Sequence, residues 1–286
     1  QIVVTAQEDA KAYVSVHDVL TQKMATFYKV LTPEKAELVE DYKTKLTTYD
    51  FSTIVIKDYP IDVACDIFAR INTGGKTLTL FEIMVAMTYD DKRHFDLAEK
   101  YEELVDGTDE DDACLSKAKF DTIPETTVMQ AVSAITAKSI RAKDILKVKR
   151  DDFISNWEPT KASLFMAVDF LRSELKIPVS QLLPYNAILV PLAYFFHVTK
   201  NKKPAKSQIL LLEQFFYWSG LAMRYTSAAD SKVGEDLKKI AEIASGGRPT
   251  YPSDELHYEG QVIESTWFST GNAFCKTILC LLASQQ

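Results

Sequence analysis

Glycine, histidine and cysteine are scarce in this chain, and their scarcity excludes several kinds of site. The 286 residues include nine glycines, four histidines and four cysteines. The sequence contains no Walker A loop, no dinucleotide-binding glycine fingerprint, and no HExxH or GxSxG motif. We therefore expect no catalytic residues and no metal-binding residues within these 286 residues.

The cysteines also lack the spacing of a structural metal site. Cys275 and Cys280 lie in an apolar segment without a histidine nearby, and Cys65 and Cys114 are isolated. A structural zinc site needs four closely placed ligands. We expect buried free thiols in a reducing cytoplasm.

Long apolar runs and a basic surplus are missing too. The two most apolar stretches, Tyr185–Val198 and Ile209–Tyr225, contain Pro191 or polar residues and predict core helices instead of membrane spans. The first residues lack the basic start and apolar core of a signal peptide. The net charge of −7 excludes a uniformly basic coat, although a local basic groove is compatible with it. These features predict a cytoplasmic protein without a membrane partner.

Helical periodicity dominates what is present. Apolar stripes predict helices over residues 17–31, 33–48, 60–70, 80–88, 95–105, 125–137, 142–148, 159–175, 185–198, 206–225, 231–244 and 272–282. Alternating β-branched residues predict a strand at Phe51–Lys57, which Ile2–Thr5 could join. The acidic run 106–112 predicts a solvated loop that separates a domain 1–110 from a domain 111–286. The predicted fold class is mainly α, a multi-helix domain with a small β remnant at the N-terminal end.

The most informative stretch is Ile67–Glu82, IFARINTGGKTLTLFE. Gly74 and Gly75 are adjacent in a glycine-poor chain, which indicates a backbone with φ > 0 or a close approach by another group. Donors suited to phosphate or a nucleic-acid backbone surround the pair: Arg70, Asn72, Thr73 and Lys76. Spacing alone favours a structural interpretation, in which the glycines end one helix and Thr79 and Glu82 form the capping box of the next.

A second candidate anion site lies near residue 231, where a new helix is predicted to begin. Its side chains would be Arg224, Tyr225, Ser227 and Lys232. In the alternative interpretation, Ser231 is a simple N-cap and Arg224 pairs with Asp230 or Glu235.

Two basic stretches, Lys138–Arg150 and Lys200–Lys206, could contact phosphate groups in a salt-dependent manner. The alternative is that they are solvated helix faces, the first of which is balanced by Asp144, Asp151 and Asp152.

Three blocks, in order, resemble one known family: IFARINTGGKTLTLFEIMVA, LPYNAILVPLAYFF and FFYWSGLAMRYTSAADSKVGEDL. They are similar to segments of GmrSD-type restriction endonucleases, in which a ParB-like domain with a DGQQR motif precedes a helical region. Neither DGQQR nor the HNH nuclease signature of the family occurs in this sequence. The resemblance thus implies the central fragment of an antiphage DNA-restriction protein, inactive alone, with residues 1–110 as the C-terminal part of the ParB-like α+β domain.

The resemblance also implies ligands and partners. By matching position, Arg70, Asn72, Thr73, Gly74 and Gly75 would complete a nucleotide pocket that DGQQR begins. We expect no cofactor within the fragment, and a nucleoside triphosphate and a divalent metal for the full-length protein. The implied partners are DNA and other copies of the protein in a homo-oligomer. A non-catalytic helical scaffold or protein-interaction domain is the alternative function.

Overall fold

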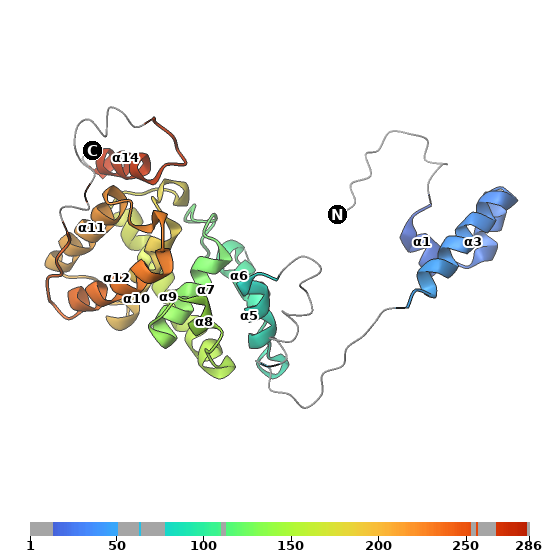
Figure 1. The fold of residues 1–286 in the computed structure, drawn as a ribbon, viewed down its shortest axis with the longest axis horizontal. Helices are drawn as coiled ribbons and strands as arrows, with labels where there is room; N and C mark the ends of the chain where they lie inside the picture. The colour runs from blue at the N-terminus through green and yellow to red at the C-terminus, as the bar shows by residue number, and fades with distance from the viewer. Residues whose placement is uncertain are drawn as a thin grey trace. The chain divides into compact units, whose positions relative to one another are not determined.

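The computed structural model describes residues 14–50, 63, 78–109, 113–252, 256 and 267–284, in two compact units, Gln1–Asp58 and Tyr59–Gln286. The described residues are mainly helical, and their one β pairing is an isolated bridge between Asp90 and Phe95 (Figure 1). The mainly α fold class is therefore confirmed. The predicted strand segments Ile2–Thr5 and Phe51–Lys57 lie outside the described residues, so the β remnant stays a prediction.

The first unit contains helices α1 (Val16–Thr21), α2 (Met24–Val30) and α3 (Pro33–Thr47). The prediction of one helix over residues 17–31 is wrong, because Gln22 and Lys23 are extended and separate α1 from α2. Lys43 of α3 donates through Nζ to the carbonyl of Gln22 at 2.5 Å and helps to hold this break. The start of α3 was predicted correctly, with Pro33 at its first position.

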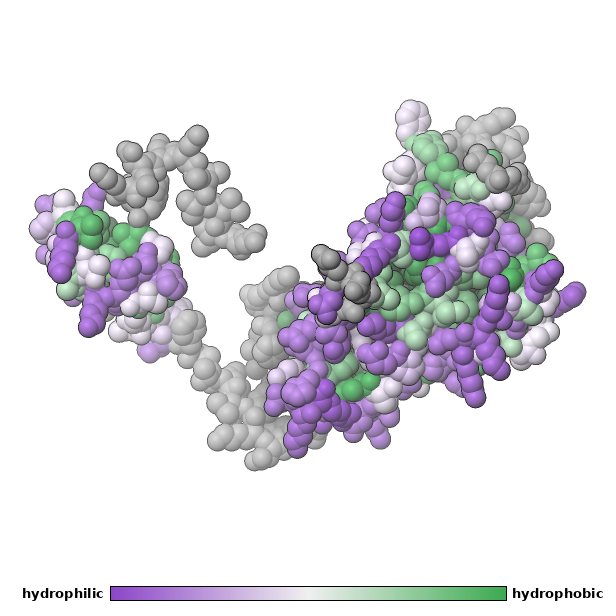
Figure 2. All heavy atoms as spheres, turned by 180° about the vertical axis from the view of Figure 1, so that it is seen from behind, coloured by the Kyte–Doolittle hydropathy of each residue, from purple (hydrophilic) through white to green (hydrophobic). Residues whose placement is uncertain are grey.

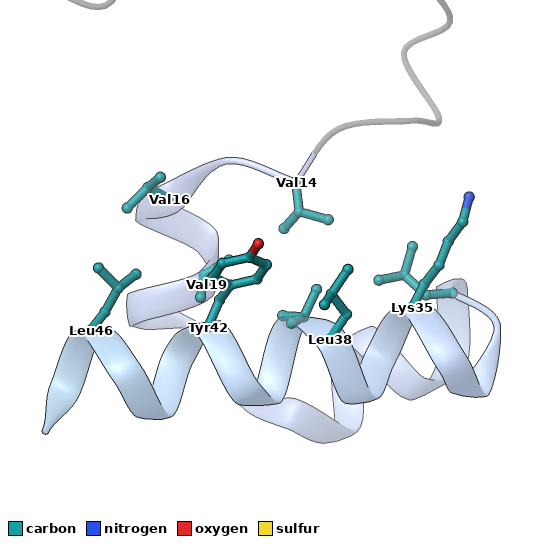
Figure 3. Close-up of a pocket in the computed structure, with 9 residues that line it drawn as sticks. Val14, Val16, Val19, Lys35, Leu38, Tyr42 and Leu46 are labelled. Atoms are coloured by element: carbon teal, nitrogen blue, oxygen red, sulfur yellow. The ribbon is translucent and has the colours of Figure 1, made fainter.

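An apolar groove runs along α3 in this unit. It has a volume of about 360 Å³, and Val16, Val19, Leu38, Tyr42 and Leu46 contribute to its lining (Figure 3). Large apolar side chains are exposed on these three helices and at Tyr49, two residues after α3: Val16, Leu20, Tyr28, Val30, Leu38, Tyr42, Leu46 and Tyr49. Green, hydrophobic surface is accordingly visible on this unit (Figure 2).

The second unit is larger and contains nearly all of the described core. Its α-helices are α5 (Leu80–Thr88), α6 (Leu97–Asp106), α7 (Glu125–Ala137), α8 (Ala142–Ile145), α9 (Arg150–Ser173), α10 (Leu189–Val198), α11 (Lys206–Leu221), α12 (Ala229–Ala244) and α14 (Ala273–Ser284). Short 3-10 turns occur at η2 (Asp91–Arg93), η3 (Ser180–Leu182), η4 (Asn186–Ile188) and η5 (Arg224–Thr226). The bounds of α5 and α7 are those predicted from the apolar pattern.

Helix α10 lies at the centre of this unit and packs against α7, α9 and α12. Its first eight residues, Leu189–Phe196, are all buried. The largest fully buried side chains of the core are phenylalanines: Phe120, Phe153, Phe195, Phe196, Phe215 and Phe216. Among the described residues, no helix has both the length and the apolar character needed to cross a membrane.

Helix α9 starts earlier than predicted. The sequence favoured a start at Pro159, a residue common at the first helical position, but the helix begins at Arg150 and contains Pro159 in its interior. The residues before the proline are held by packing, since Phe153 and Trp157 are buried and both meet the ring of Phe95 edge to face. Tertiary packing here offsets the cost of an internal proline.

Helix α14 closes against α11 and η3. A Cβ atom at position 220 would lie 2.7 Å from Cγ2 of Thr277, which is too close. Gly220 therefore allows α11 and α14 to approach closely. Cys280 donates through Sγ to the carbonyl of Leu182 at 3.4 Å. Of the predicted buried free thiols, Cys114, Cys275 and Cys280 are confirmed, and Cys65 lies outside the described residues.

The acidic run 106–112 lies inside the second unit. On its two sides, Leu115 donates its backbone N–H to Leu104, and Ser116 donates to Val105, at 3.0 and 2.9 Å. The division between the two compact units falls after Asp58. The predicted domains 1–110 and 111–286 stay a prediction.

Candidate functional site

The first candidate site, Arg70–Lys76, lies outside the described residues. Its neighbour along the chain, the capping box of α5, is confirmed: the hydroxyl of Thr79 accepts from the N–H of Glu82 at 3.1 Å, and the Glu82 carboxylate accepts from the N–H of Thr79 at 2.6 Å. This capping box fixes where α5 begins. Phosphate contacts at Arg70–Lys76 stay a prediction.

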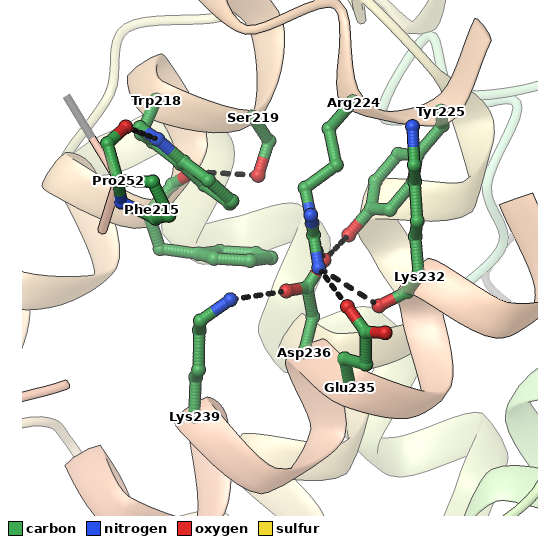
Figure 4. A network of polar contacts seen from close by, with 10 residues as sticks. All are labelled: Phe215, Trp218, Ser219, Arg224, Tyr225, Lys232, Glu235, Asp236, Lys239 and Pro252. Carbon is green, nitrogen blue, oxygen red and sulfur yellow. Dashed lines mark hydrogen bonds and ion pairs between the residues drawn. The ribbon is translucent and has the colours of Figure 1, made fainter. Parts of the chain in front are cut away.

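The second candidate site surrounds Arg224, whose side chain is only 5% exposed. Its Nε donates to Oδ2 of Asp236 at 2.7 Å, and its Nη2 donates to Oε2 of Glu235 at 2.8 Å (Figure 4). Asp236 is fully buried, whereas the carboxylate of Glu235 is 63% exposed. Burial lowers the pKa of Arg224, but the bonds to Asp236 and Glu235 outweigh burial and raise it overall. The guanidinium is thus held by carboxylates of the chain itself.

Tyr225 reaches the same carboxylate. Its hydroxyl donates to Oδ2 of Asp236 at 2.7 Å, so one oxygen accepts hydrogen bonds from both Arg224 and Tyr225. Burial, together with the negative charge of Asp236, raises the pKa of Tyr225 well above its usual value. The phenol therefore remains protonated and serves as a fixed donor.

An aromatic layer completes the network. The guanidinium of Arg224 and the ammonium of Lys239 each lie 4.8 Å from the centre of the Trp218 ring. Lys239 also lies 3.2 Å from Oδ1 of Asp236 and 5.8 Å from the centre of the Tyr251 ring. Such contacts stabilise cations that are removed from water. The network links α11, η5 and α12 to the segment that carries Tyr251 and Pro252, whose carbonyl accepts from the indole of Trp218.

The structure brings only part of the predicted second site together. Arg224 and Tyr225 meet at Asp236, and Lys232 contributes its backbone carbonyl, 3.5 Å from Arg224, to the same network. Ser227 is exposed at the turn before α12. Because α12 begins at Ala229, Ser231 is not the N-cap that the alternative interpretation assumed. That interpretation was right that Arg224 pairs with Glu235, but it did not include Asp236.

Asp236, Lys239, Trp218 and Tyr251 were not predicted from the sequence. One signal was available, because the apolar stripe of α12 passes through Val233, Leu237 and Ile240, and Asp236 shares their buried face. An aspartate at a core position of a helix requires a cationic partner. The hydroxyl of Tyr251 is buried and has no hydrogen-bond partner among the described residues.

No set of residues within the described ranges gathers the three or more histidine, cysteine or carboxylate side chains that a metal ion needs. Comparisons with protein-family models, with curated proteins and with solved structures found no match for this chain.

Proposed function

We propose that this chain is the central part of a GmrSD-like antiphage DNA-restriction protein. In this role it contributes half of a nucleotide or DNA-backbone pocket through Arg70–Lys76, and the helical second unit supports that half. The sequence carries no complete set of catalytic motifs, so the chain is inactive alone. The full-length protein would use a nucleoside triphosphate and a divalent metal.

The observation that carries this proposal is a contact between two of the three sequence blocks on which the resemblance rests. The block 183–196 contains Tyr185, and the block 215–237 contains Tyr225 and Thr226. The rings of Tyr185 and Tyr225 meet edge to face at 5.6 Å, and the hydroxyls of Tyr185 and Thr226 are 2.7 Å apart. Helix α10, which lies mostly in the block 183–196, also packs on α12, which begins in the block 215–237. The two blocks therefore pack together, and this contact supports the proposal that they belong to one core.

Titration with nucleoside triphosphates tests the proposal. We expect binding to this chain that weakens on Arg70→Ala and Lys76→Ala substitution, without turnover of the nucleotide. Lys92→Ala is the matched control for Lys76→Ala, since it removes the same charge from an exposed position outside the loop. Robust hydrolysis by the chain alone would contradict the claim that its active site is incomplete.

A helical scaffold is the second candidate function, and the Arg224 network favours it. The buried charges of that site, Arg224 and Asp236, are paired within the chain, which is typical of a structural network and not of a binding pocket. A chain that folds normally and binds neither nucleotide nor DNA would support the scaffold.

A further inference from the structure

Exposed cations cover the connection from the end of α7 to the start of α9. We call this set the basic surface: Lys138, Arg141, Lys143, Lys147, Lys149 and Arg150, all of them exposed. Ile140, Ile145 and Val148 alternate with them and are buried in the core. These apolar residues hold the connection against the second unit and leave the cations in solvent.

Within the part of the chain that the structure describes, most of these cations have no ionic partner. Arg150 lies 3.7 Å from Asp90, and Arg141 donates to the hydroxyl of Ser231 at 3.2 Å. The four lysines of the basic surface make no ion pair among the described residues. Six cations and three carboxylates occupy residues 138–152, which leaves three positive charges in excess.

The three carboxylates are themselves partly engaged. Asp151 pairs with Arg93, and Asp144 accepts from the hydroxyl of Ser139 at 2.7 Å. Asp152 is exposed in the first turn of α9. The positive excess is therefore not cancelled locally.

A hollow of about 470 Å³ lies within this surface, and its lining indicates the shape of the ligand. Lys147 and Lys149 line it, but so do Asp144 and Asp152. A small anion seated in the hollow would meet both carboxylates, which would repel it. Lys138, Arg141 and Lys143 do not line the hollow. A linear polyanion is long enough to contact cations both inside and outside the hollow.

The other lysine-rich stretch differs in its surroundings. Lys200, Lys202, Lys203 and Lys206 are all exposed, but the hollow that Lys203 lines also contains Asp169 and Glu174. The four lysines and these two carboxylates leave an excess of two positive charges, against three in residues 138–152. The two stretches thus offer equal numbers of lysines in different electrostatic settings.

The surface also lacks what a membrane-binding patch needs. A peripheral membrane site combines cations with apolar side chains that enter the lipid. The described residues of the connection, 138–150, include none of the exposed large apolar side chains. Hydrophilic residues cover much of the second unit in Figure 2.

We propose that the basic surface binds the phosphate backbone of duplex DNA without reading its sequence. The choice of DNA over another polyanion rests on the proposed function, whereas the location rests on the charges alone. Four lysines that contact phosphates release counterions, so the affinity will fall steeply with salt.

Fluorescence anisotropy with a short fluorescein-labelled duplex tests this surface. The test variant replaces Lys138, Lys143, Lys147 and Lys149 with glutamine, and the control variant does the same to Lys200, Lys202, Lys203 and Lys206. Both lose four positive charges. We expect binding by the test variant to be more than about tenfold weaker, with a log–log salt slope smaller by up to about 3.6, or about 0.9 for each lysine. The control should stay within about threefold of the unmodified chain, because only long-range attraction is reduced. Circular dichroism and thermal unfolding establish that both variants fold.

Three results would overturn the inference. An equal loss of DNA affinity in both variants would show that the binding depends on net charge and not on this surface. Unchanged affinity in the test variant would show that DNA binds elsewhere on the chain. Sedimentation with phosphatidylserine vesicles, in the absence of any DNA binding, would assign the surface to a membrane. The nucleotide titration at Arg70 and Lys76 involves none of these lysines, so it can fail or succeed independently.

Discussion

Arg224 and Asp236 form a buried ion pair that joins the turn after α11 to the middle of α12. Nε of the arginine lies 2.7 Å from Oδ2 of the aspartate, and the two residues are 5% and 0% exposed. The chain turns on both sides of η5, where Met223 before it and Ala228 after it adopt left-handed backbone conformations. Each residue supplies the opposite charge that the other needs in the core. The pair therefore stabilises the turn between α11 and α12.

Removal of one partner should be costly. We expect Arg224→Met to lower the free energy of unfolding by about 3–5 kcal/mol, because it leaves the carboxylate of Asp236 buried without its main cation. Glu235→Gln should change it by less than about 1 kcal/mol, since that carboxylate is 63% exposed. Urea denaturation measures both. Similar losses of unfolding free energy in the two variants would contradict the central role of Asp236. The double variant Arg224→Met, Asp236→Leu should be more stable than Arg224→Met alone, because it leaves no buried charge unpaired at these two positions.

Two glycines should respond in opposite directions to alanine. Gly220→Ala should destabilise the second unit by about 1–3 kcal/mol, because the new methyl group would overlap the side chain of Thr277. Gly234→Ala should stabilise it by about 0.4–1 kcal/mol, since Gly234 lies inside α12 with open space around it.

A double-mutant cycle checks the cause of the Gly220 effect. Thr277→Ala should recover much of the stability that Gly220→Ala removes, because it deletes Oγ1 and Cγ2, the two atoms that overlap most. Equal destabilisation by Gly220→Ala with and without Thr277→Ala would show that the overlap is not the cause.

The capping box of α5 offers a local measurement. Thr79→Ala should cost about 1 kcal/mol, because the N–H of Glu82 loses its acceptor. Glu82→Gln should cost less, since glutamine also accepts from the N-cap backbone in such boxes. Thermal unfolding followed by circular dichroism compares them, and an equal or larger loss for Glu82→Gln would contradict the assignment.

The thiols should differ in their dependence on pH. Burial raises the pKa of Cys280 to about 11, whereas the bond with Ser116 lowers the pKa of Cys114. In the folded chain we therefore expect iodoacetamide to modify Cys114 before Cys280 at mildly alkaline pH, as peptide mass spectrometry would reveal. The raised pKa also means that the Cys280 contribution to stability is complete below about pH 9 and is lost as the pH rises through about 11. Alkylation of Cys280 at the rate of Cys114 would contradict its burial.

Features set by neighbouring residues were predictable from the sequence. Pro33 at the start of α3 and the pair Thr79 and Glu82 at the start of α5 depend only on local hydrogen bonds, and both are confirmed. The apolar period of residues 125–137 was enough to bound α7.

Features set by distant residues were not predictable. The helical state of residues 150–158 depends on the contact of Phe153 and Trp157 with Phe95, far earlier in the chain. The direction of Arg224 depends on a turn that brings Asp236 beneath it, and sequence spacing did not distinguish that carboxylate from Asp230. Lys239 pairs with Asp236, and it also meets the rings of Trp218 and Tyr251, which approach to 4.9 Å from distant parts of the chain.

The central position of α10 has a consequence for hydrogen exchange. The backbone amides of a helix enclosed by α7, α9 and α12 cannot reach solvent through fraying of an end or opening of a loop. They exchange only when most of the second unit unfolds. The exchange rates of the slowest amides in Leu192–Phe196 would thus measure the free energy of unfolding of the whole unit, under native conditions and without denaturant.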